Sequence, residues 1–360
     1  MDELVALTAA LVAIPSHEDE TAAGEAIATW LREHTDTSVA VDDAGNVVAR
    51  RGDGPSLALV GHHDVVPPAD EQVEGEGFAV EERDGRLYGR GTADMKGAVA
   101  AMLLAFRDAD PPGELVFASF AGEEDGGVGA RAAIEDGFAP DFAVVGEGST
   151  GYSAAGVTDV AIAHKGRRGS TLVAGGESAH ASEPGAGVNA VYRAADAVDV
   201  VRDLAAPSAT VFGEPMTGSL AVTGIEGGEA WNVIPDECTV TVDERTVPGD
   251  RAALARTEDV DGVEWRVDQD LPPMRCDDPE FADAVQAAAD EHQDGDPQQV
   301  RKPHATDAGW LADAGTTCLV CGPAEPGEAH TDDESVAIDA LHRLRRIYEA
   351  VANDWPGHVD

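Results

Sequence analysis

Positive charge is scarce in this chain. Its 360 residues include 69 acidic and 24 basic side chains, which gives a formal net charge of −45. Only three of the basic residues are lysines: Lys96, Lys165 and Lys302. Nucleic acids and anionic membranes are therefore poor partners, because their phosphates would be repelled. An acidic, lysine-poor composition is typical of a halophilic protein, since concentrated salt screens the repulsion between exposed carboxylates.

Cysteine and long apolar runs are scarce as well. Four scattered cysteines, Cys238, Cys276, Cys318 and Cys321, are too few for a disulfide framework. Cys318 and Cys321 have C-x-x-C spacing but lie in an apolar run with no second pair, which favours a buried strand over a zinc or redox site. No segment reaches the roughly 18 apolar residues of a membrane span, and the first residues lack signal-peptide features. We therefore expect a cytoplasmic protein with no membrane partner.

The apolar residues, 43% of the chain, occur in short runs separated by glycine and proline, which indicates a folded protein. Helical spacing predicts two helices in the first thirty-odd residues and a third over Ala98–Phe106. Four further runs are typical of buried strands: Leu57–Val60, Leu115–Ala118, Ala143–Val145 and Thr317–Val320. Strands that alternate with helices favour an α/β fold, with a mostly parallel sheet covered by helices on both faces.

The pattern changes near Gly166, where strands follow one another with a single helix among them. The expected strands are Ser170–Ala174, Leu220–Gly224, Cys238–Val242 and Val263–Val267, and the expected helix is Val188–Val201. This order favours a smaller α+β domain inserted into the first one, because the buried-strand pattern returns near Thr316. We therefore expect a main domain of residues 1–165 and 272–360 and an inserted domain of residues 166–271.

Side chains that can bind metal follow the ends of the predicted strands. His62, Glu124, Glu147 and His330 each follow one of the four apolar runs, and Asp94 opens the helix between the first two. The carboxyl ends of parallel strands share one edge of a sheet, so these side chains should converge there. Two imidazoles and three carboxylates suit divalent ions such as zinc or cobalt. Five ligands are many for one tetrahedral ion, so we expect two metal ions.

Two further acidic residues suit supporting roles at such a site. A metal-bound imidazole usually donates its second N–H to a carboxylate, and Asp64 is the candidate partner of His62. Neighbouring side chains on an extended segment point in opposite directions, so Glu123 and Glu124 should differ in role. One would bind metal while the other acts as general base. A Glu-Glu pair by itself is weak evidence for a catalytic site, because it arises easily by composition in so acidic a chain. The metal site is favoured because a strand followed by a turn and a potential ligand recurs four times.

Seven short motifs occur along the chain in the order Gly61–Pro67, Gly89–Gly97, Gly122–Glu124, Gly146–Glu147, Ser178–Ala181, Asn232–Pro235 and Ala329–His330. These motifs and their order resemble those of the M20 family of co-catalytic zinc amidohydrolases and peptidases. The resemblance implies that His62, Asp94 and Glu147 bind one metal, that Asp94, Glu124 and His330 bind the other, and that Glu123 is the base. It also implies two divalent ions, with zinc the default and cobalt possible, and a cis peptide after Asp94.

The inserted domain has implied roles too. The resemblance indicates a ferredoxin-like lid domain that mediates homodimerisation, with His180 reaching from the partner subunit to stabilise an oxyanion. Asn232 and Arg245 match positions that contact substrate in the family. Two of these residues have a plainer alternative. His180 could be a loop histidine with local hydrogen bonds only, and Arg245 could form an ordinary surface ion pair.

Within the family, three segments are most similar to succinyl-diaminopimelate desuccinylases: Asn232–Cys238, Thr306–Ala308 and Ala329–Glu334. This resemblance implies hydrolysis of the small-molecule substrate N-succinyl-LL-2,6-diaminopimelate to succinate and diaminopimelate, a step of lysine biosynthesis. Two residues depart from the family pattern without removing a metal ligand. Gly148 stands where the family commonly has proline, and His63 stands where a small polar residue is usual. The alternatives are an acetylornithine deacetylase, a dipeptidase or carboxypeptidase, and a non-catalytic metal-binding relative.

Overall fold

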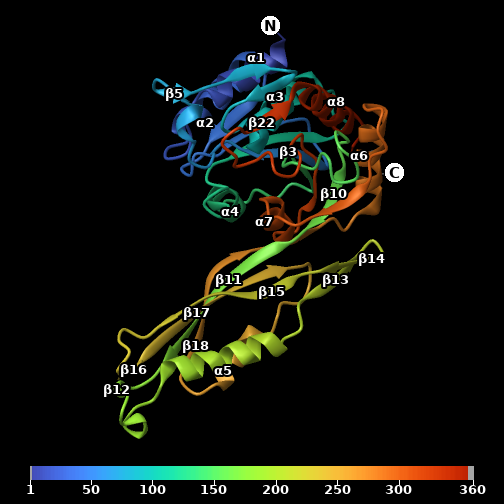
Figure 1. Cartoon of the computed structure of the whole chain (residues 1–360). Helices are drawn as coiled ribbons and strands as arrows, with labels where there is room; N and C mark the ends of the chain where they lie inside the picture. The colour runs from blue at the N-terminus through green and yellow to red at the C-terminus, as the bar shows by residue number, and fades with distance from the viewer. Residues whose placement is uncertain (1, 356–360) are drawn as a thin grey trace. The chain divides into compact units, whose positions relative to one another are not determined.

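The chain divides into two compact units, which are described separately below. The computed structural model describes residues 2–355. The first unit comprises residues 2–164, 274–302 and 306–355, and the second comprises Lys165–Pro273 with Pro303–Ala305. The chain thus leaves the first unit after His164 and returns to it at Met274 (Figure 1).

The first unit is an α/β assembly. Its helices are α1 (Glu3–Val12), α2 (Thr21–His34), α3 (Gly97–Asp108), α4 (Val128–Glu135), α6 (Pro279–Glu291), α7 (Ala308–Asp313) and α8 (Ile338–Asp354). The strands of its main sheet are β1 (Ser38–Val41), β2 (Val47–Arg51), β3 (Ser56–His62), β8 (Glu114–Phe120), β9 (Phe142–Val145), β10 (Val160–His164), β19 (Met274–Arg275), β20 (Gln299–Lys302) and β21 (Thr317–Val320). Smaller sheets contain β4 (Val73–Glu74), β5 (Gly77–Phe78), β6 (Glu81–Arg83), β7 (Arg86–Tyr88) and β22 (Ser335–Ala337).

The centre of the main sheet is parallel. Its order is β1-β2-β8-β3-β9-β21-β10-β19, and β20 also pairs with β10. Strands β8, β3, β9 and β21 run parallel, whereas β1, β2 and β19 pair antiparallel with their neighbours. The predicted α/β class is therefore confirmed. Because parallel strands present their carboxyl ends together, the four predicted strands direct their following loops to one edge.

Both faces of this sheet are covered, as its uniformly apolar strands require. All of β3 is buried. Ala58 and Val60 pack on one face with Ala130 of α4 and Leu311 of α7. On the other face, a Cβ at Gly61 would lie 2.9 Å from Val99 of α3, so glycine allows that helix to approach the strand closely.

The second unit consists of an antiparallel sheet and one long helix. Its elements are β11 (Gly166–Gly175), β12 (Ala179–His180), α5 (Ala190–Asp203), β13 (Ser208–Val211), β14 (Glu214–Thr217), β15 (Ser219–Gly227), β16 (Val233–Ile234), β17 (Glu237–Thr246) and β18 (Val263–Leu271). The main sheet has the order β15-β17-β11-β18. Alternate residues of β11 are buried, including Leu172 and Ala174, and they pack with Ala194 and Val201 of α5. Helix α5 lies along one face of the sheet (Figure 1). One face of this sheet therefore forms the core of the unit.

Several elements were not anticipated from the sequence. β1 and β2 extend the main sheet beyond the predicted strands, and β10 with β20 extends its other side. β1, β2 and β20 are short and only partly buried, so their strand conformation depends on pairing with neighbours rather than on local pattern, whereas β10 is a short buried apolar run that was missed. Within residues 2–355, no helix is both long and apolar enough to cross a bilayer.

Candidate metal centre

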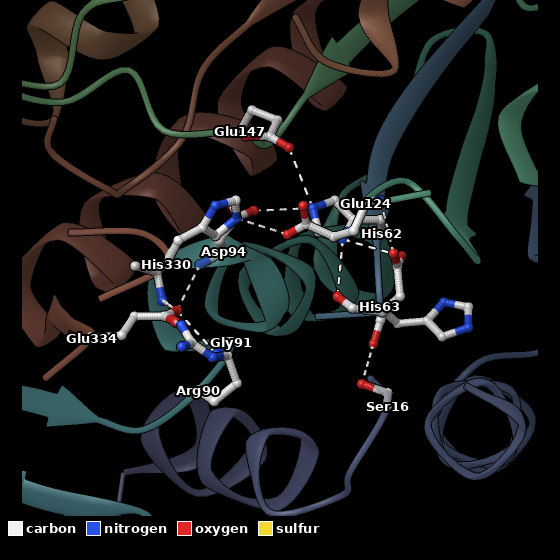
Figure 2. A network of polar contacts seen from close by, with 12 residues as sticks. Ser16, His62, His63, Arg90, Gly91, Asp94, Glu124, Glu147, His330 and Glu334 are labelled. Atoms are coloured by element: carbon white, nitrogen blue, oxygen red, sulfur yellow. Dashed lines mark hydrogen bonds and ion pairs between the residues drawn. The ribbon is translucent and has the colours of Figure 1, made fainter. Parts of the chain in front are cut away.

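Five side chains from distant parts of the first unit meet beyond the ends of its parallel strands (Figure 2). His62 ends β3, Glu124 lies in the turn after β8, and Glu147 follows β9. Asp94 lies just before α3, and His330 lies in the loop before β22. Their potential ligand atoms form two groups, each within 4.8 Å: His62, Asp94 and Glu147, and Asp94, Glu124 and His330.

Asp94 belongs to both groups. Its Oδ1 lies 3.0 Å from His62 Nε2, and its Oδ2 lies 3.1 Å from His330 Nε2. The backbone turns sharply here: Asp94 and Met95 have non-helical backbone angles just before α3, and the Asp94–Met95 peptide is cis, as the resemblance implied. The carboxylate therefore lies between the two imidazoles with one oxygen toward each.

The donor set fits a pair of divalent metal ions. His62 Nε2 faces Asp94 Oδ1 at 3.0 Å and Glu147 Oε1 at 3.3 Å, while His330 Nε2 faces Glu124 Oε1 at 2.8 Å and Asp94 Oδ2 at 3.1 Å. A ring nitrogen carries at most one hydrogen, so it can donate only one well-aligned bond to such a pair of oxygens. A cation can be bound by the nitrogen and both oxygens at once. One imidazole with two carboxylates in each group suits zinc or cobalt.

Asp64 holds the orientation of His62. The Nδ1 of His62 lies 3.1 Å from the main-chain oxygen of Asp64 and 3.3 Å from its Oδ1. The other carboxylate oxygen of Asp64 accepts the main-chain N–H of Glu124 at 2.9 Å. Asp64 therefore directs Nε2 of His62 toward Asp94 and Glu147, and it also contacts the turn that carries the second group.

The ionisation of these groups reflects burial among carboxylates. Burial lowers the pKa of His62, but hydrogen bonds with Asp64, Asp94 and Glu147 outweigh it and hold the pKa well above its usual range. Hydrogen bonds with Asp94 and Glu124 raise the pKa of His330 to about 10. Both imidazoles therefore carry a proton at neutral pH when no metal is bound, and a metal ion would displace it.

Glu123 differs from Glu124 in environment. Burial is the largest cause that raises the pKa of Glu123 well above its usual range; His62 opposes it, and the carboxylates of Glu147 and Asp307 add to it. Burial raises the pKa of Glu124 as well, but the hydrogen bond of Glu124 with His330 opposes this effect. The expected reason for this difference was wrong, because residues 123–126 form a turn rather than an extended segment. The different surroundings of the two carboxyl groups separate them.

Two residues beside the groups were not predicted as metal ligands or as the base. The ammonium of Lys302 lies 3.9 Å from Glu147 Oε2 with its side chain 5% exposed, and burial lowers its pKa. Both carboxylate oxygens of Asp307 are buried and have no hydrogen-bond partner among residues 2–355, and burial raises the pKa of Asp307 to about 7. Lys302 ends β20, and Asp307 directly precedes α7. The sequence drew attention to Lys302 because so acidic a chain must supply positive charge for substrate carboxylates, and to Asp307 only through the resemblance of Thr306–Ala308.

His180, Asn232 and Arg245 belong to the second unit. His180 pairs with Val233 across the β12–β16 ladder, and the main-chain oxygen of Asn232 accepts the N–H of Ala181 at 2.9 Å, so His180 and Asn232 are neighbours. Arg245 lies toward the end of β17, where its Nε donates to Asp243 Oδ1 at 2.9 Å. The unit therefore places His180 and Asn232 together, whereas Arg245 forms the ion pair that the sequence left as its alternative.

Comparison with known proteins agrees with this geometry. The model of peptidase family M20/M25/M40 matches residues 58–354. A succinyl-diaminopimelate desuccinylase of Rhodospirillum centenum is 32% identical over 335 residues, which cover 86% of this chain and 84% of the relative. An acetylornithine deacetylase of Pectobacterium carotovorum is 34% identical over 213 residues, 57% of this chain and 54% of the relative.

Solved structures share the fold. Aminopeptidase PepT of Bacillus cereus superposes with a TM-score of 0.80 at 18% identity, covering 98% of both chains. The YXEP protein of Bacillus subtilis, a dinuclear metal-binding peptidase of the M20 family, superposes with a TM-score of 0.69 at 16% identity, covering 97% of this chain and 96% of that one. The family match spans most of the sequence and includes all five potential ligands. The chain therefore belongs to peptidase family M20/M25/M40 and is a metallo-amidohydrolase.

Proposed function

We propose that this enzyme hydrolyses an N-acyl amide of an amino acid, and that N-succinyl-LL-2,6-diaminopimelate is its substrate. The observation that carries the reaction type is the placement of Asp94 between two imidazoles, with the partly buried carboxyl of Glu123 close enough for its charge to interact with that of Asp94. The relatives named succinyl-diaminopimelate desuccinylase support the choice of substrate, since one of them matches 86% of the chain.

The two groups of side chains would hold the two metal ions. His62, Asp94 and Glu147 would bind one ion, and Asp94, Glu124 and His330 would bind the other. When bound, zinc or cobalt would polarise the scissile carbonyl and lower the pKa of the attacking water. Asp64 keeps His62 in the tautomer that presents Nε2 to the site.

Glu123 is the proposed general base. Its carboxyl belongs to neither group of ligands, and its raised pKa favours accepting a proton. It would take a proton from the attacking water and return it to the nitrogen of the leaving amine. The bond broken is the amide C–N bond, and the products are the acyl carboxylate and the free amine.

His180, Asn232 and Arg245 are the proposed substrate contacts of the second unit. The Nδ1 of His180 accepts the main-chain N–H of Ser182 at 3.2 Å, so the proton of the neutral ring is on Nε2. This N–H can donate to the oxyanion of a tetrahedral intermediate, as can the amide of Asn232. We propose that the enzyme is a homodimer in which His180 serves the active site of the partner subunit.

The negatively charged substrate needs local positive charge in this acidic protein. Lys302 is buried beside Glu147 and offsets part of the charge of the carboxylates. Arg245 is partly exposed, with its side chain at 38%, and its guanidinium can bind a carboxylate in a bidentate manner. These cations support a substrate that carries carboxylate groups.

A substrate panel tests the proposal. The protein, loaded with Zn²⁺ or Co²⁺, is assayed against N-succinyl-diaminopimelate, N-acetylornithine and dipeptides under identical conditions. The highest kcat/KM is expected for the succinyl substrate. A preference for N-acetylornithine would favour the deacetylase alternative, which the 34% identical relative also supports. Two bound metals with no hydrolysis of any member would contradict an amidohydrolase function.

A further inference from the structure

Glu334 makes four polar contacts with the turn that carries Asp94. The side chain of Glu334 is fully buried, and its Oε1 accepts the main-chain N–H groups of Gly91, Ala93 and Asp94 at 3.0, 2.9 and 3.1 Å. Its other oxygen, Oε2, accepts from the guanidinium of Arg90 (Figure 2). A buried carboxylate is costly unless it is paired and hydrogen-bonded, and these contacts satisfy both of its oxygens.

The same residue connects two segments that carry ligands. Glu334 follows His330 by four positions and lies 240 residues after Asp94. Its main-chain oxygen accepts the N–H of Gly89 at 3.0 Å, and the next residue, Ser335, pairs with Tyr88. The loop of His330 and the turn of Asp94 are therefore joined through both the backbone and the side chain of Glu334.

We propose that Glu334 is a positioning residue for both metal ions. It holds the turn that places Asp94 between His62 and His330, and this role rests on the metal groups of the proposed function. Asp94 is the one member that the two groups share, whereas Glu147 and Glu124 each belong to a single group. Loss of the Glu334 contacts should therefore lower the affinity of the protein for both metal ions together.

The Glu334→Gln variant removes the negative charge of the side chain but nearly keeps its shape. In Glu334→Gln the amide oxygen can still face the three N–H groups, but the negative charge is lost and an NH₂ donor faces Arg90. Hydrogen bonds to a carboxylate are stronger than those to a neutral amide, so the turn is held less firmly. Residues that orient metal ligands typically contribute 10- to 100-fold to metal affinity, and we expect a loss of about this size.

The experiment titrates Co²⁺ into metal-free protein and follows visible absorption and heat for both binding steps. The E334Q variant is expected to lose affinity at both steps. E147Q is the comparator, because it should lower the affinity for Co²⁺ at one binding step far more than at the other. E328Q is the matched control: the carboxylate of Glu328, in the same loop, contacts Arg86 and the main-chain N–H of Glu325 instead of the turn of Asp94, so Co²⁺ binding should match wild type.

Activity supplies a second readout. If Glu334 acts by holding the metals, excess Co²⁺ should restore most of the kcat of E334Q with little change in KM, whereas general misfolding would not be reversed by metal. Circular dichroism without metal checks the fold. If E334Q does not fold, Glu334→Asp keeps the charge but shortens the side chain, and the same loss at both steps is expected.

Two results would overturn the inference: E334Q binding both ions with wild-type affinity, or losing only one of them. Wild-type protein that binds fewer than two ions would instead contradict the proposed metal groups, so the two failures can be distinguished.

Discussion

At the scale of single residues, the site depends on placing like groups in unlike surroundings. Glu123 and Glu124 are adjacent, both are partly buried, and burial raises the pKa of each, yet the carboxylate of Glu124 contacts His330 whereas that of Glu123 interacts with the charges of Glu147 and Asp307. Protonation equilibria of this kind allow one carboxyl to move a proton while its neighbour stays a ligand.

The Glu123→Gln variant tests the role of the base. Glutamine keeps the size of the side chain but cannot accept a proton, so kcat should fall by about 10²- to 10⁴-fold while the metal content stays at two ions. Metal content is measured by atomic absorption and kcat with the best substrate of the panel. Asp125→Asn, an exposed neighbour in the same turn, is the control. Full activity of E123Q would remove Glu123 from the mechanism.

The pH dependence of the metal-free protein follows from His330. Its folded-state pKa of about 10 lies above the usual value of 6.5, so the stabilisation by its protonated form is complete below pH 6.5 and is lost as pH rises through 10. Thermal unfolding in EDTA should therefore shift to lower temperature between pH 7 and 10. Replacing His330 by Gln should reduce this shift, and His62, whose pKa is raised as well, accounts for a further part of it. An unchanged shift would mean that His330 does not contribute.

At the scale of elements, the start of α3 fixes the turn that carries Asp94. A Cβ at Gly97 would lie 2.5 Å from the main-chain oxygen of Thr92 and 2.9 Å from Leu341 of α8. Gly97 has ordinary helical backbone angles, so the close approach of other atoms, rather than its conformation, requires glycine.

Gly97→Ala should therefore destabilise the protein although alanine is the better helix former. The expected loss is about 1–3 kcal/mol, because the added methyl group meets backbone that cannot move away. Urea unfolding of the metal-free protein measures it. Gly185→Ala is the control: a Cβ at Gly185 would have no atom of the described residues within 4 Å beyond its chain neighbours, so the effect should stay within about 0.5 kcal/mol. Equal stability of G97A and wild type would show that the turn can adapt.

At the scale of the whole molecule, we propose that the enzyme is a homodimer in which His180 serves the active site of the partner subunit. Mixing two inactive variants tests this. E123Q lacks the base and H180A lacks the oxyanion donor, so a mixed dimer would contain one active site with both residues intact. Subunit exchange should restore up to about a quarter of wild-type activity. If H180A is as active as wild type, or if the mixture stays inactive although exchange is verified, His180 does not act across the interface.

The sequence determined much of this protein because its signals are local. Apolar runs identified the strands of the parallel centre, and His62, Glu124 and Glu147 follow those strands directly, so topology alone directs them to one edge. The surplus of acidic residues likewise indicated that the few cations near the site, such as Lys302, would matter.

The tertiary structure decided what local pattern could not encode. The contacts of Glu334 with the turn of Asp94 join residues 240 positions apart, and nothing in the composition of either segment predicts them. The turn at Glu123 and Glu124 is also not the extended segment that the sequence favoured, because Gly126 and Gly127 lie in the left-handed region and reverse the chain before α4. Periodicity describes how a residue relates to its neighbours along the chain, whereas hydrogen-bond partners across the fold depend on the path of the backbone between them.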